Sequence, residues 1–155
     1  MKAVYKEDYS PLERFVQQEV TRQHFPTSKL WIDGKTLVVE FVIEDPDYGS
    51  KYHLQVRYYS QRHHQVFVIR PRIIPSVAIH MYPDGSLCLY YPPDISPFRR
   101  LWVAKDLIPM AALWVCHYEQ WLINGRVWKG REAPGHRQLL QRLSQRSENV
   151  SPALK

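Results

Sequence analysis

Apolar and polar positions alternate along two segments in the first half of the chain, which is the pattern of strands with one buried face. The apolar positions are Leu37, Val39, Phe41 and Ile43 in residues 35–43, and Tyr52, Leu54, Val56 and Tyr58 in residues 51–59. A third short strand is predicted at residues 65–70, and a further one at Trp31 and Ile32, before the turn Asp33-Gly34. Turn-rich sequence separates these segments, so the simplest topology is an antiparallel meander.

A helix is predicted ahead of the strands. Ser10, Pro11 and Glu13 form a capping box, in which the serine accepts from the amide of Glu13 and the glutamate reaches back. An apolar stripe follows at helical spacing, made of Leu12, Phe15, Val16 and Val20. Phe25-Pro26 ends the element, because proline disfavours the helical conformation of the residue before it. We expect the stripe to pack against the rest of the protein.

Two more helices are predicted in the last third of the chain. Asp106 is expected to cap the first of them, and its apolar stripe comprises Leu107, Met110, Ala111, Trp114, Val115, Tyr118, Trp121 and Leu122. Residues 136–146 form a basic amphipathic pattern, and a polar tail follows at 147–155. The order of helix, meander, irregular segment and helices predicts one α+β domain over residues 1–146.

Composition narrows the class of protein. The 155 residues, 45% of them hydrophobic, suffice for one core, and the formal charge of +6 favours an acidic partner. A nucleic-acid partner is not expected, because no recognisable binding motif accompanies that charge. No apolar run is long enough to span a membrane and the first residues lack the apolar stretch of a secretory signal, so we expect a cytoplasmic protein with free thiols.

Residues 71–100 are too apolar for a linker and lack any period, and they contain the sequence DGSLCL around Cys88. Gly85 permits a tight turn just before the cysteine. Leu87 and Leu89 would anchor the segment in the core, so alternation turns Cys88 the other way, toward solvent. An accessible thiolate is a strong nucleophile, and a thioester holds an acyl group ready for transfer to an amine. The alternative is a small buried cysteine with a packing role.

The arrangement of a leading helix, a meander, a cysteine-bearing irregular segment and C-terminal helices resembles that of ubiquitin-conjugating enzymes (the UBC fold). HMYPDGSLCLYYP, Trp102, HYEQWLINGRVWKG, Glu132 and His136 are more closely similar to the bacterial relatives in anti-phage CBASS operons. The resemblance implies that Cys88 carries an acyl group as a thioester. It also implies a protein partner, either a cGAS-like nucleotidyltransferase (CD-NTase) joined through its C-terminus or a ubiquitin-like protein.

The resemblance also suggests roles for three residues near Cys88, each with a plainer alternative. In the eukaryotic family a histidine begins a His-Pro-Asn triplet, and here His80-Met81-Tyr82 takes its place. His80 is expected to support the backbone, the alternative being a general base. Tyr82 would replace an amide as the oxyanion donor with a phenol of different reach. Asp84 either orients an incoming lysine or makes the Pro-Asp-Gly turn, and the turn is favoured.

Other chemistry is weakly indicated. Cys116, within the long helix, is expected to be an inert and poorly exposed residue. His117, Glu119 and His136 do not form Cys-x-x-Cys or His-x-x-x-His spacings, so no metal is predicted. No cofactor is predicted either, because the chain has no Gly-rich nucleotide loop; whether a separate activating enzyme takes part stays open. The second hypothesis is a catalytically silent basic module that recruits a protein or a nucleic acid.

Overall fold

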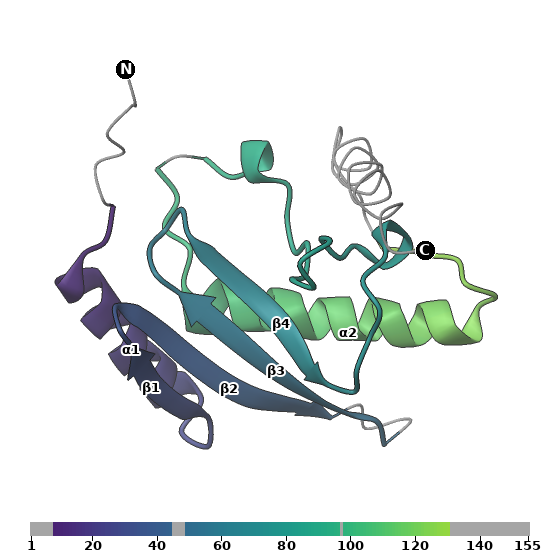
Figure 1. Ribbon diagram of the computed structural model, residues 1–155, viewed down its shortest axis with the longest axis horizontal. Coiled ribbons are helices and arrows are strands. Elements are labelled where there is room, and N and C mark those ends of the chain that lie inside the picture. Colours follow the sequence, from purple (N-terminus) through teal and green to yellow (C-terminus); the bar gives the residue numbers. More distant parts are fainter. Residues whose placement is uncertain (1–7, 45–48, 97, 131–155) are drawn as a thin grey trace, which may run out of the picture.

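A four-stranded antiparallel sheet organises the protein (Figure 1). The computed structural model describes residues 8–44, 49–96 and 98–130. The strands follow one another in chain order as β1 (Lys29–Asp33), β2 (Thr36–Glu44), β3 (Lys51–Tyr58) and β4 (His64–Arg70). The predicted meander and the predicted α+β class are therefore confirmed. The predicted helix at residues 136–146, the tail at 147–155, Glu132 and His136 lie outside the described residues.

One face of the sheet carries the core. The predicted alternation is confirmed, since Leu37, Val39, Phe41, Tyr52, Leu54, Val56 and Tyr58 are all buried. Helix α2 (Ile108–Ile123) runs across this face (Figure 1) and buries Ala111, Trp114 and Val115 against it. Apolar burial of this kind is the main stabilising term of a domain of this size. No helix in the described part of the chain is long and apolar enough to cross a membrane.

Helix α1 (Pro11–His24) begins where predicted, but its buried face is polar and is not the predicted apolar stripe. The Ser10 side chain accepts from the amide of Glu13 at 3.2 Å, as a cap should. The predicted apolar stripe is wrong as a buried face, because Leu12 is 72% and Phe15 57% exposed, whereas Gln17 and Thr21 are fully buried. The physical reason is a polar contact: Gln17 donates to the Leu101 carbonyl at 2.9 Å and accepts from the Val103 amide at 2.9 Å.

Glu13 does not reach back to close the capping box. Its carboxylate instead accepts from the Tyr58 hydroxyl at 3.2 Å and from Gln17 at 3.0 Å, and it pairs with the Arg100 guanidinium. Glu13 and Gln17 thus join α1 to residues 100–103, where the irregular segment ends. This polar connection fixes one end of the segment that carries Cys88.

The long helix begins later than predicted and without a side-chain cap. A π-helical turn, η3 (Val103–Leu107), precedes α2, and Asp106 lies inside it. The Asp106 carboxylate accepts from the Trp102 amide at 2.8 Å and from Arg99 at 2.8 Å. Asp106 therefore closes the preceding turn onto the irregular segment, and the prediction that it caps the helix is wrong.

Candidate active site

The segment that carries Cys88 lies along the free edge of β4. The Leu87 amide donates to the Val66 carbonyl at 2.8 Å, and Phe67 forms an isolated bridge with Ser86. Met81 pairs with Leu87 across a turn in which Gly85 has a φ of 89°. Residues other than glycine rarely adopt that φ, so the role predicted for Gly85 has a physical basis. The turn brings Tyr82 and Cys88 onto neighbouring strands of a small hairpin.

Cys88 belongs to this hairpin and is only 4% exposed. The prediction of an accessible thiol is therefore wrong for this conformation, and Leu89, expected in the core, is only partly buried. The Cys88 thiol donates to the Tyr82 hydroxyl at 3.2 Å, and its Sγ is 3.8 Å from the Tyr90 carbonyl oxygen. The physical reason for the burial is that the turn folds the Tyr82 phenol back over the thiol.

Burial controls the acidity of this site. It raises the pKa of the Cys88 thiol to about 11, while the hydrogen bond with Tyr82 acts in the opposite direction. Burial also raises the pKa of Tyr82, and the neighbouring Cys88 adds to that effect. The thiolate is then a very small minority at pH 7. In this conformation the thiol is held in its neutral, protected form.

His80 has a supporting position. Its backbone carbonyl accepts from the Cys88 amide at 2.8 Å, and it occupies the left-handed region with a φ of 54°. The His80 ring stacks on Trp128, with centroids 4.9 Å apart, and Trp114 Nε1 donates to the Ile79 carbonyl at 2.8 Å. These contacts fit the backbone-support role predicted for His80. Trp114 and Trp128 take part in that support; of these two, only Trp128 lies in the HYEQWLINGRVWKG stretch, and the sequence assigned neither of them this role.

Asp84 makes the turn. Its carboxylate accepts from the Ser86 amide at 2.8 Å and from the Ser86 hydroxyl at 2.6 Å, and it also accepts from the Gln65 side-chain amide at 2.7 Å. These three contacts occupy both of its oxygens. The favoured turn role of Asp84 therefore has direct structural support, and its role toward an incoming lysine has none.

Sequence reasoning missed a histidine and tyrosine pair beside the thiol. His64 Nε2 lies 2.5 Å from the Tyr90 hydroxyl, and His64 Nδ1 lies 3.2 Å from the Ser60 carbonyl. A carbonyl only accepts, so Nδ1 carries the proton and Nε2 accepts from Tyr90. Burial lowers the pKa of His64 and raises that of Tyr90, so both are neutral at pH 7. Nothing in the sequence QRHHQ distinguished His64 from its neighbours.

Cys116 lies on the outward side of α2 and is exposed. The prediction of a poorly exposed thiol is therefore wrong. The reason is helical phase, since the neighbours Trp114 and Val115 take the buried positions and rotate Cys116 outward. Within the described ranges no three histidine, cysteine or acidic side chains gather as metal ligands.

Taken together, a meander sheet crossed by a long helix, with a cysteine held on an edge segment, defines a protein with a fold like that of ubiquitin-conjugating enzymes. The family described as "Type II CBASS E2 protein" matches residues 17–137, and the chain belongs to that family. The match covers the sheet, the Cys88 segment and α2. Membership gives the protein an E2-like role within CBASS and a partner in that system, and it suggests conjugating activity. No curated protein matches the chain.

Proposed function

We propose that Cys88 forms a thioester with the C-terminal carboxyl group of a partner protein, a cGAS-like CD-NTase, and transfers it to an amine. The observation that supports this proposal is the Cys88 site itself: a thiol on a turn at the sheet edge, hydrogen-bonded to the Tyr82 hydroxyl at 3.2 Å. Conjugation of the CD-NTase then regulates the anti-phage response of CBASS. A ubiquitin-like protein is the other candidate for the transferred group.

The chemistry needs an activated carboxyl group, such as an acyl adenylate or another thioester. The Cys88 sulfur attacks the acyl carbon, the carbon–sulfur bond forms, the leaving group departs and the thiol proton passes to solvent. In the second step an amine attacks the same carbon, a carbon–nitrogen bond forms, the Cys88 thiolate leaves and the amine gives up a proton. Tyr82 is suited to donate to the sulfur or to the acyl oxygen in both steps.

The buried position of Cys88 adds a condition to the proposal. A thiol with a pKa of about 11 reacts slowly. The partner must therefore open the Cys88 segment when it binds, so that the thiol is exposed only in the complex. A protected thiol of this kind avoids oxidation and wasteful acylation while the protein is free.

The same burial favours a second candidate function, a catalytically silent module that only recruits a protein. The two functions predict different products. A silent module forms a complex with the CD-NTase and no covalent adduct, whereas a conjugating enzyme forms both.

The test is co-expression with the CD-NTase of the same operon, followed by a non-reducing gel. We expect a covalent adduct that reductant removes in the wild-type protein and in Cys116→Ala, and no adduct in Cys88→Ala. Size-exclusion chromatography of Cys88→Ala with the CD-NTase should still give one peak. A complex without any adduct in the wild type would establish the silent module instead, and an adduct at full yield in Cys88→Ala would exclude Cys88.

A further inference from the structure

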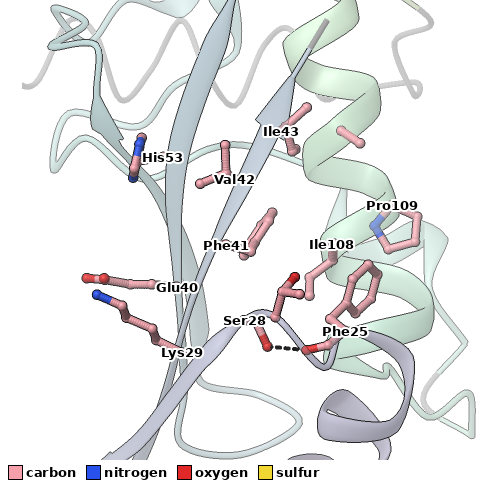
Figure 2. Close-up of a pocket in the computed structure, with 12 residues that line it drawn as sticks. Phe25, Ser28, Lys29, Glu40, Phe41, Val42, Ile43, His53, Ile108 and Pro109 are labelled. Carbon is pink, nitrogen blue, oxygen red and sulfur yellow. Dashed lines mark hydrogen bonds between the residues drawn. The ribbon is translucent and has the colours of Figure 1, made fainter. Parts of the chain in front are cut away.

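A cavity of about 640 Å³, separate from the Cys88 site, opens between the end of α1, the edge of β2 and the start of α2 (Figure 2). Its walls are mostly apolar and include Phe25, Phe41, Ile43, Ile108, Pro109 and Ala112. In Figure 2 the side chains of Phe25, Ile108 and Pro109 face β2 across the opening. The volume lies in the range of ligand-binding pockets, and none of its lining residues belongs to the Cys88 site.

The cavity adjoins a stretch of β2 that has no neighbouring strand on one side. Strand β1 pairs with Thr36 to Glu40 only, because the chain turns away before Lys29. Residues 41–44 pair with β3 on their other side. Within the described residues they therefore form an open strand edge, and Val42 is 51% exposed.

The hydrogen bonds of the sheet show which backbone groups face this opening. The Tyr59 amide donates to the His63 carbonyl at 2.9 Å, so the backbone of Tyr59 faces β4. Backbone groups of successive residues point to opposite sides of a strand. Tyr52 and Leu54 therefore face β2, and their partners Ile43 and Phe41 face β3. Between them, the amide and carbonyl of Val42 point away from β3, into the open edge.

An independent contact supports the same alternation. Val66 pairs with Val56, which must face β2, so the carbonyl of Val66 must face away from β3. It does, because it accepts from the Leu87 amide at 2.8 Å. The assignment of Val42 to the open edge thus rests on two separate parts of the sheet.

We propose that this edge and cavity bind a short, uncharged, extended peptide segment of a partner protein, which adds a strand to β2. The Val42 amide and carbonyl would pair with one residue of the peptide. The residues before and after it lie opposite Phe41 and Ile43 and point their side chains into the cavity, toward Pro109 and Ala112. The segment is therefore apolar at two positions separated by one residue.

Size and charge on the surface select this occupant. The open edge is four residues, or about 13 Å, long. An edge this short offers much less surface than the ~800 Å² per partner that a stable interface between folded proteins buries, which argues against a second copy. The charged rim residues Lys29 and Glu40 are cross-strand partners of opposite sign, and Glu40 is held by Gln55 at 3.0 Å. The rim charges therefore cancel, which favours an uncharged segment.

The test uses a fluorescent peptide with the central sequence Ile-Thr-Val between Gly-Ser flanks and measures anisotropy with the full-length protein. We expect saturable binding, weakened at least about tenfold when the threonine amide is N-methylated, since that removes one strand hydrogen bond. Ala112→Glu, which places a charge in the cavity, should weaken binding by a similar factor. Leu113→Glu, on the exposed neighbour that does not line the cavity, should leave it unchanged.

Three outcomes would overturn the proposal. The first is no binding at millimolar peptide. The second is equal binding of both peptides, which would make the cavity a site for apolar molecules without strand addition. The third is dimerisation of the protein that Ala112→Glu abolishes, which would show that a second copy covers the edge. Thermal unfolding of each variant checks its fold, and the comparison of the two peptides needs no variant.

Discussion

The exposure of the two cysteines is the reverse of what the sequence predicts. Cys88, on the irregular edge segment, is buried and hydrogen-bonded to the Tyr82 hydroxyl, whereas Cys116, on a regular helix, is exposed. The segment around Cys88 is held by backbone hydrogen bonds to β4 and by burial of Met81 and Leu87, whereas α2 is held by apolar packing along a regular helix. The difference teaches that local alternation and helical stripes do not decide the exposure of a single thiol. On the proposed function, the buried thiol with specific polar neighbours, and not the exposed one, carries the acyl group.

The largest expected effect is in the rates of alkylation. Iodoacetamide should label Cys116 rapidly in the native protein, whereas burial and a pKa of about 11 keep Cys88 slow. In Cys116→Ala the remaining thiol should react at least about 100-fold more slowly than free cysteine at pH 7.5. Its rate should still rise with pH up to about 11, because the thiolate fraction grows until the pH passes the pKa. Fast labelling of Cys88 in the folded state would contradict its burial.

The polar support of the Cys88 segment should show in Gln17→Leu. This change leaves the buried Val103 amide without its partner and removes one of two donors to the Leu101 carbonyl, which keeps Gln61 at 2.8 Å. We expect a loss of about 1–3 kcal/mol in the free energy of unfolding, measured by urea denaturation. Phe15→Ala, on the exposed side of the same helix, is the control and should change stability by less than about 0.5 kcal/mol. A larger loss of stability in Phe15→Ala than in Gln17→Leu would mean that α1 packs through its apolar stripe.

A smaller effect is expected for Tyr82→Phe. Without the hydroxyl, the pKa of Cys88 should rise further, because the hydrogen bond with Tyr82 holds it down. The pH at which alkylation of Cys88 becomes fast should move upward, and stability should fall by about 1 kcal/mol. Tyr59→Phe serves as the matched control. An unchanged pH profile in Tyr82→Phe would show that the phenol does not act on the thiol.

The smallest expected effect concerns His64, next to Tyr90. Burial lowers the pKa of His64 below its ordinary value of 6.5, so the neutral ring is favoured in the folded state. The stability this gives is fully present above pH 6.5 and is lost as the pH falls through the lowered pKa. His64→Gln should therefore flatten the fall in stability just below pH 6.5. Urea denaturation at several pH values measures this pH dependence of the free energy of unfolding.

The sheet could be predicted because alternation has a period that only strands satisfy, and Leu54 and Val56 are buried as that period requires. Three features could not be predicted, because they depend on contacts between distant residues or on how a turn folds back. Gln17 forms a hydrogen bond with a segment 84 residues away, and α1 therefore buries its polar face. Asp106 closed a turn onto Trp102. The Tyr82 phenol covered Cys88, although local alternation alone would have exposed it.

The most direct test of the central claim, that Cys88 is the acyl carrier, is to trap the intermediate in Cys88→Ser. The variant is co-expressed with the CD-NTase of the same operon, digested and mapped by mass spectrometry. The account predicts an ester between the C-terminal residue of the partner and the hydroxyl introduced at position 88, stable to reductant, where the wild type has a thioester that reductant cleaves. A partner attached through a different residue, or an adduct of unchanged yield and chemistry in Cys88→Ala, would contradict the account.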